Sequence, residues 1–219
     1  MQCCQVTEAR RSSTGRFFGW FAKSYARSFR RGGLEKIQRL LLDGVRTSVN
    51  GNLSNLRLLD VGCGVGALHL TLLQEGAATA QGVDLSQGML DQAAEISASL
   101  NLSERVAYIR GDFVTLNGSL SAADVTMLDK VVCCYSDAPA LIARTAEVTT
   151  RTIALSHPRD LWPIRIVWKT QAFLARLFRF SFYPCWHHWP DVALDVERHG
   201  FRETYRAKTL LWEVGVFSK

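Results

Sequence analysis

Three glycines at alternate positions, Gly62, Gly64 and Gly66, follow an apolar run at 56–61. This run has the composition of a buried strand, and the segment after the glycines has the composition of a helix. Glycines between a strand and a helix let the backbone approach a ligand, because no side chain obstructs it. We therefore predict a site for a nucleotide-like ligand at this loop rather than a glycine-rich turn alone.

An acid lies about twenty residues beyond the loop, where Asp84 ends the next apolar run and can accept hydrogen bonds from ribose hydroxyls. Gly62, Gly64 and Ala67 also fit the permissive G-x-G-x-x-A pattern of dinucleotide-binding proteins, so an NAD-binding oxidoreductase is one hypothesis. Asp60 argues against it, because an acid so close to the first glycine would lie near the negative pyrophosphate. A cationic sulfonium and an amino group would tolerate that acid. The charges therefore favour S-adenosylmethionine as the ligand.

Strand-like runs and helix-like periods alternate along most of the chain. Residues 1–15 are polar and expected to be loose, and two helices, 16–31 and a second from Leu34 to Asn50, are expected before the first strand. Strands are predicted at 56–61, 79–84, 105–110, 124–129 continuing toward Tyr135, 152–157, 202–208 and 210–217. Helices are predicted at 67–75, 87–100, after Pro139 and at 191–199. This order predicts right-handed β-α-β units, hence an α/β fold with a parallel sheet.

These residues resemble the class I S-adenosylmethionine-dependent methyltransferase family. The D-x-G-x-G-x-G segment at 60–66 is similar to the first motif of the family, 82–86 to the second and 111–113 to the third. The resemblance covers 56–157 well and 190–219 loosely. It implies a Rossmann-like, doubly wound, seven-stranded sheet, mostly parallel with an antiparallel last strand. It also implies S-adenosylmethionine as cofactor and methyl transfer as the activity.

The resemblance implies specific contacts to the cofactor. Asp112 would meet the adenine amino group, Phe113 would pack on the ring, and Met89 would either pack on the adenosine or belong to the core of its helix. Tyr25 is similar to a lid tyrosine that reaches the methionine carboxylate in small-molecule members, although the acid that commonly follows that tyrosine is missing here. The predicted cofactor-binding residues are Asp60, Gly62, Cys63, Gly64, Gly66, Asp84, Leu85, Met89, Asp112, Phe113, Asp129 and Tyr25.

Ligands of an open α/β sheet bind beyond the carboxyl ends of its strands, so residues after the fourth and fifth strands should face the methyl group. These residues are Asp129, Lys130, Tyr135 and His157. Methyl transfer to oxygen or nitrogen requires in-line alignment, and a base where the acceptor is not already ionised. His157 is the first candidate for that base, because of its pKa range, with a structural role as the alternative. Asp129 is a rival base or a partner of Lys130, and Tyr135 completes the predicted catalytic set.

We divide the chain into a tail and helical lid, 1–50, and a methyltransferase domain, 51–219, with an aromatic and basic helical insertion at 160–190. Three hypotheses account for the insertion. It is a helix packed on the sheet with a solvated basic edge, an apolar cover over a hydrophobic acceptor, or a surface helix that contacts an anionic membrane. Four cations of this segment fall within a sector of roughly 80° on a helical wheel. They are Arg165, Lys169, Arg176 and Arg179.

The net charge of +6 favours anionic partners such as nucleic acid, anionic lipid or an anionic small molecule. Nucleic acid is not expected, because the cations accompany aromatic-rich helices. The segment LDKVVCCY after the fourth strand also lacks the Asn-Pro-Pro-Tyr-like motif usual in family members that methylate base amines.

No apolar run is long enough to span a membrane, and the N-terminus lacks the apolar core of a secretory signal. We therefore expect a cytoplasmic protein, with peripheral membrane contact as an open alternative. Its six cysteines contain no C-x-x-C pair, so we expect free thiols and no metal. The predicted function is methyl transfer to a small, hydrophobic acceptor. The alternative is a non-catalytic module that only binds S-adenosylmethionine.

Overall fold

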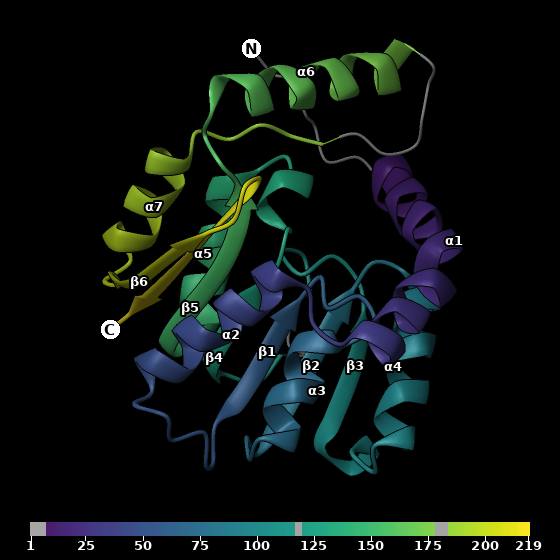
Figure 1. The fold of residues 1–219 in the computed structure, drawn as a ribbon, viewed down its shortest axis with the longest axis vertical. Helices are drawn as coiled ribbons and strands as arrows, with labels where there is room; N and C mark the ends of the chain where they lie inside the picture. The colour runs from purple at the N-terminus through teal and green to yellow at the C-terminus, as the bar shows by residue number, and fades with distance from the viewer. Residues whose placement is uncertain (1–7, 117–119, 178–183) are drawn as a thin grey trace.

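The computed structural model describes the backbone of residues 8–116, 120–177 and 184–219 and, within these ranges, the side chains of all residues except 8–13 and 176. Seven strands form one sheet in the order β3-β2-β1-β4-β5-β7-β6 (Figure 1). Their bounds are β1 Arg57–Val61, β2 Thr79–Asp84, β3 Val106–Arg110, β4 Ala123–Leu128, β5 Thr149–Pro158, β6 Arg202–Lys208 and β7 Trp212–Ser218. The first five strands pair in parallel, and β7 pairs antiparallel with both β5 and β6. The predicted mixed sheet with an antiparallel last strand is confirmed.

Helices cover both faces of this sheet. Their bounds are α1 Glu8–Gly32, α2 Lys36–Ser48, α3 Ala67–Gln74, α4 Gln87–Ser99, α5 Ala138–Val148, α6 Trp162–Leu177 and α7 Trp189–Arg198, with short 3-10 turns η1 Ser103–Arg105 and η2 Val132–Cys134. One apolar core joins α2, α3 and α4 to one sheet face, and a second joins α5 and α7 to the other. Leu58 faces the first core, whereas Leu59 and Val61 face the second. Strand β1 is therefore buried on both faces, which explains its continuous apolar run.

The first N-terminal helix differs from the expectation in where it begins. Helix α1 already begins at Glu8, so part of the segment expected to be loose is helical. Small residues, Gly15, Gly19, Ala22 and Ala26, form one face of α1, and a Cβ on Gly15 would lie 2.6 Å from the carbonyl oxygen of Leu85. This close approach sets α1 against α4 and the loop before it. Helix α2 packs into the core through Ile37, Leu41, Leu42 and Val45.

Strand β4 also differs from its predicted bounds. Strand β4 ends at Leu128, and the chain turns into η2 instead of continuing as a strand toward Tyr135. The turn begins at Lys130, whose φ of 60° cannot continue an extended strand. Helix α6 lies across the top of the molecule, above the carboxyl ends of the strands (Figure 1). Residues 178–183 of the predicted insertion, including Arg179, lie outside the described residues, as does the side chain of Arg176.

Candidate functional site

A cavity of about 420 Å³ lies at the carboxyl ends of the central strands. Its lining comes from the glycine loop, the ends of β2 and β4, η2, the two N-terminal helices, α6 and the start of β7. Nine of the predicted cofactor-binding residues line it: Tyr25, Asp60, Gly62, Cys63, Gly64, Asp84, Leu85, Met89 and Asp129. Predicted site residues separated by up to about a hundred positions in the chain therefore share one cavity.

The three loop glycines all have positive φ, at 65° for Gly62, 53° for Gly64 and 84° for Gly66. At Gly62 and Gly66 a side chain would also lack space. A Cβ on Gly62 would lie 2.6 Å from a methyl carbon of Val131, and a Cβ on Gly66 would lie 3.0 Å from the ring of His69. A Cβ on Gly64 would meet no atom within 4 Å, because this residue faces the cavity. Gly64 is therefore the position where the backbone is open to a ligand, whereas Gly66 serves the turn into α3.

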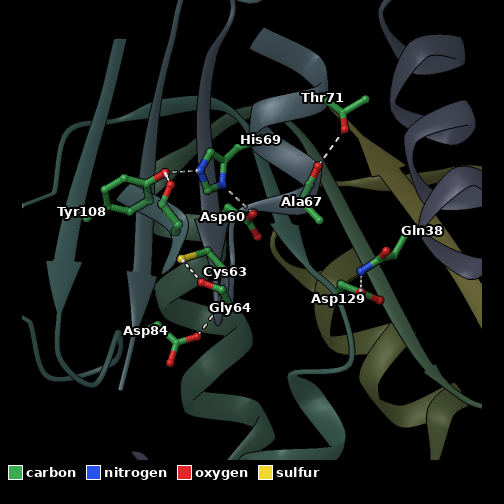
Figure 2. Close-up of polar contacts among 11 residues, drawn as sticks. Gln38, Asp60, Cys63, Gly64, Ala67, His69, Thr71, Asp84, Tyr108 and Asp129 are labelled. Atoms are coloured by element: carbon green, nitrogen blue, oxygen red, sulfur yellow. Dashed lines mark hydrogen bonds and ion pairs between the residues drawn. The ribbon is translucent and has the colours of Figure 1, made fainter. Parts of the chain in front are cut away.

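Asp84 ties the glycine loop to the end of β2, as Figure 2 shows. The backbone N–H of Gly64 donates to its Oδ2 at 2.9 Å, and the N–H of Ser86 donates to its Oδ1 at 2.8 Å. Burial raises the pKa of Asp84, and these two hydrogen bonds oppose that shift. Each carboxylate oxygen has a second lone pair, so Asp84 can still accept hydrogen bonds from a ligand at the cavity wall.

Asp60 is held by a buried histidine that our sequence analysis did not select. The ring Nδ1 of His69 lies 2.8 Å from Oδ2 of Asp60, and its Nε2 lies 3.2 Å from the hydroxyl of Tyr108 (Figure 2). The Tyr108 hydroxyl donates in turn to the carbonyl of Ala93 at 3.1 Å. His69 is fully buried and fixes the orientation of a carboxylate that lines the cavity. The available signal was a histidine between two leucines, Leu68 and Leu70, in the mainly apolar segment that forms α3.

A polar cluster after β4 also lines the cavity. Asp129 accepts hydrogen bonds from the Oγ of Ser156 at 2.5 Å and from the Nε2 of Gln38 at 3.0 Å (Figure 2). Lys130 Nζ lies 2.6 Å from a carboxylate oxygen of Glu35. Burial raises the pKa of Asp129, against the opposing effect of Lys130. Burial alone would lower the pKa of Lys130, but the charges of Asp129 and Glu35 outweigh it and raise that pKa.

Tyr135 also lines the cavity, and its hydroxyl lies 3.1 and 3.2 Å from the two carboxylate oxygens of Asp112. Neither Asp112 nor Phe113 is among the described residues that line the cavity. Phe113 packs instead in the core on the α5 side of the sheet. The structure thus places Tyr135, rather than the two residues of the third motif, at the cavity wall.

His157 lies outside this cavity and has the environment of a structural residue. Its ring stacks on Trp189 with centroids 3.3 Å apart, and its Nδ1 lies 2.8 Å from the carbonyl oxygen of Pro158. Its Nε2 is buried and has no hydrogen-bond partner among the described residues. Burial lowers the pKa of His157 to about 3, so the ring is a weak base at neutral pH. This geometry argues against our first candidate for the general base and leaves Asp129 and Tyr135 of the predicted catalytic set in the cavity.

No helix within the described ranges combines the length and apolarity needed to cross a bilayer. The same ranges contain no group of three or more His, Cys, Asp or Glu side chains placed to hold a metal ion. The four described cysteines, Cys63, Cys133, Cys134 and Cys185, are free thiols. Burial raises the pKa of Cys63 well above its ordinary value, so this cavity residue is a neutral, small side chain rather than a nucleophile.

Comparisons with known proteins agree with this architecture. Residues 58–151 match a family model described as a methyltransferase domain. A magnesium protoporphyrin IX methyltransferase from Synechocystis PCC 6803, solved with bound SAH, is similar with a TM-score of 0.70 and 20% identity, over 96% of this chain and 99% of that one. The [4+2]-cyclase SpnF is similar with a TM-score of 0.71 and 14% identity, over 95% of this chain and 96% of that one.

An O-methyltransferase family protein from Burkholderia thailandensis gives a TM-score of 0.71 and 16% identity, over 96% of this chain and 61% of that one. A sequence search of curated proteins finds no match. At such low sequence identity the solved structures show the fold alone. The matched family model indicates the type of domain. Together, the methyltransferase domain at 58–151 and the shared fold confirm the resemblance to the class I S-adenosylmethionine-dependent methyltransferases that the motifs predict.

Proposed function

We propose that the protein transfers a methyl group from S-adenosylmethionine to an oxygen or nitrogen of a small, apolar acceptor. One observation carries this proposal: the open glycine loop and the aromatic side chains of Tyr135, Trp168 and Trp212 line a single cavity. The methyltransferase match at 58–151 and the solved structures named as methyltransferases support the reaction type. The cyclase of the same fold is a reason to test activity directly, because a fold alone does not determine chemistry.

The lining residues at and near the glycine loop fit S-adenosylmethionine. Gly64 leaves room for the ligand beside the backbone, Asp84 would accept hydrogen bonds from the ribose, and Met89 with Leu85 would pack on the adenosine. Asp60 would face the positively charged amino acid part. When bound, the cofactor supplies an electrophilic methyl group on its sulfonium.

The charge of the cavity also favours this cofactor over a dinucleotide. Its described lining contains four acids, Glu35, Asp60, Asp84 and Asp129, but one lysine, Lys130. A pyrophosphate would bring two further negative charges into this surface, whereas a sulfonium and an ammonium group would be attracted to it. The balance of charges therefore supports S-adenosylmethionine as the ligand.

The aromatic part of the lining suits an apolar acceptor with one reacting polar group. Trp168, Trp212 and Tyr135 provide aromatic walls, and the indole rings of Trp168 and Trp212 meet edge to face with centroids 5.8 Å apart. Asp129 is the proton acceptor that we propose, because its raised pKa brings its basicity closer to that of a hydroxyl or amine nucleophile. The hydrogen bonds from Ser156 and Gln38 hold this carboxylate in place and leave lone pairs for the acceptor.

Calorimetry followed by a transfer assay tests the proposal. S-adenosylmethionine and S-adenosylhomocysteine should bind with micromolar affinity, while NAD should give no heat of binding. Methyl-labelled S-adenosylmethionine should then label members of a panel of apolar phenols, carboxylic acids and amines. Comparable heat from NAD would contradict the cofactor assignment. Tight binding without transfer to any class of the panel would instead support a non-catalytic module.

A further inference from the structure

Helix α6 exposes a continuous apolar surface to solvent. Trp162 is 74% exposed and Phe173 is 64% exposed, and Ile166 and Leu177 are also exposed. On a helix of about 100° per residue these four side chains lie within about 60° of one another. Exposed residues Val167 and Leu174 widen the same face. A solvent-facing helix surface normally carries polar residues, so this surface requires a partner.

The turn between β6 and β7 extends this surface. Leu210 is 80% exposed, and its neighbour Leu211 is also exposed. The N–H of Arg159 donates to the carbonyl of Leu211 at 2.9 Å, which places this turn beside Leu161 at the start of α6. Leu161 is itself exposed. We call the whole set the outer apolar face: Leu161, Trp162, Ile166, Val167, Phe173, Leu174, Leu177, Leu210 and Leu211.

The charged side chains of α6 beside the outer apolar face are positive. Helix α6 contains no acidic residue, and Arg165 and Lys169 lie along one edge of its apolar arc. Arg165 contacts Asp160 at 2.5 Å and lies over the ring of Trp186 at 5.8 Å, so its charge is partly offset. Lys169 is exposed. Aromatic and aliphatic side chains flanked by cations match the interface of a bilayer with anionic headgroups.

A second copy of the chain fits this surface less well. Lys169 lies at the middle of α6, between Trp162 and Leu177. Two copies that paired along α6 by a twofold axis through its centre would therefore bring their Lys169 side chains together. An anionic surface would instead attract these cations. The charge pattern thus favours lipid over self-association.

From the exposure and charge of this face, we infer that the protein docks on anionic membrane surfaces with α6 lying in the plane of the headgroups. The opposite side of α6 contributes Trp168 and Gln171 to the lining of the cavity. A docked α6 therefore lies between the bilayer and the cavity, and an apolar acceptor dissolved in the membrane would enter beside it. Docking itself does not depend on the proposed methyl transfer; only the route of the acceptor does.

Vesicle flotation tests the docking. The probes are vesicles of phosphatidylcholine alone and of phosphatidylcholine mixed equally with phosphatidylglycerol. The wild-type protein should float with the anionic vesicles at low salt and be released at high salt, because the Debye length falls from about 10 Å at 0.1 M to about 3 Å at 1 M. Lys169→Gln should weaken the association about fivefold, the contribution of one interfacial cation.

A double variant and a matched control distinguish vesicle binding through this surface from nonspecific adsorption. Trp162→Ser with Phe173→Ser should reduce vesicle association at least about tenfold. Trp20→Ser removes an 89% exposed tryptophan of α1 that is not part of the outer apolar face, and it should float like the wild type. Both variants should bind S-adenosylhomocysteine as the wild type does, since neither changes the cavity lining.

Three results would overturn the inference. The wild type could fail to float with anionic vesicles at low salt, or the double variant could float as well as the wild type. Sedimentation could also show that the wild type is a dimer and the double variant a monomer, while the wild type does not associate with vesicles. That result would assign the outer apolar face to a second copy of the chain. Heat from S-adenosylhomocysteine in the same samples shows whether the cofactor site is intact, so failure of docking is distinguishable from failure of the proposed function.

Discussion

Replacing His157 by Phe should flatten the loss of stability at acid pH. In the folded protein, burial lowers the pKa of His157 to about 3, while the nearby carbonyl of Pro158 opposes the shift. Arg206 lowers this pKa further and Asp160 raises it, but neither dominates. In the unfolded chain the same ring becomes protonated near pH 6.5. Acid therefore favours the unfolded state.

The two pKa values of His157 determine the sign and the size of the change in the free energy of unfolding with pH. Because the folded value lies below the unfolded one, His157 carries no penalty well above pH 6.5, and the free energy of unfolding falls as the pH drops toward 3. Between about pH 7.5 and about pH 5, this one group costs about 2 kcal/mol. Phe keeps a ring against Trp189 and gains no proton, so the variant should lose about 2 kcal/mol less over the same interval. The missing hydrogen bond to Pro158 lowers its stability by about 1 kcal/mol at every pH.

Urea unfolding followed by circular dichroism at the two pH values measures this difference. The constant cost of the lost hydrogen bond cancels when each protein is compared with itself. An equal loss in wild type and variant would refute the reasoning from burial. The methyl-transfer rate of the variant should stay within about threefold of the wild type, because His157 lies outside the cavity. A fall of about a hundredfold or more with the fold intact would restore His157 as the base.

Three further substitutions test the cavity. Gly64→Val should weaken S-adenosylhomocysteine binding about a hundredfold or more in calorimetry. The control Gly76→Val, also at positive φ but away from the cavity, should keep normal affinity. Equal affinities of the two variants would exclude the loop as the binding site. Asp129→Asn should slow methyl transfer about a hundredfold or more with little change in cofactor affinity, and an unchanged rate would remove Asp129 as the base. His69→Phe should lower the free energy of unfolding, measured in urea, by about 3 kcal/mol, because it leaves the buried Asp60 without its partner. A loss below about 1 kcal/mol would show that Asp60 does not need the contact with His69.

The grouping of residues around the glycine loop could be predicted because it is encoded in a short continuous stretch. Strand β1, the three positive-φ glycines and Asp84 all lie within residues 57–84, where strand, turn and helix patterns follow each other directly. The hydrogen bond from the Gly64 N–H to Asp84 is a consequence of that local order. The alternation of strands and helices likewise predicts the sheet, because parallel strands require crossover helices.

The contacts of Asp129 and Lys130 could not be predicted in the same way, because they connect distant segments. Gln38 reaches Asp129 across 91 positions, and Lys130 reaches Glu35 across 95. No sequence motif or periodic pattern indicates such pairs. His157 illustrates the converse error: it follows the fifth strand as an active-site residue might be expected to, but packing against Trp189 places its ring on the wrong side of the strand for the cavity.

Lys130 indicates that the turn after β4 is shaped for the cavity at a cost in stability. Its φ of 60° lies in the left-handed region, which costs a residue with a Cβ about 1 kcal/mol or more. In this conformation its N–H donates to the Oγ of Ser156 at 2.9 Å, and that Oγ donates to Asp129 at 2.5 Å. Its ammonium group contacts Glu35 at the start of α2. Glycine would adopt the same φ without strain, but it would leave two acids of the cavity without their cation. The strain therefore accompanies a charge pairing that only a long cationic side chain at this turn provides.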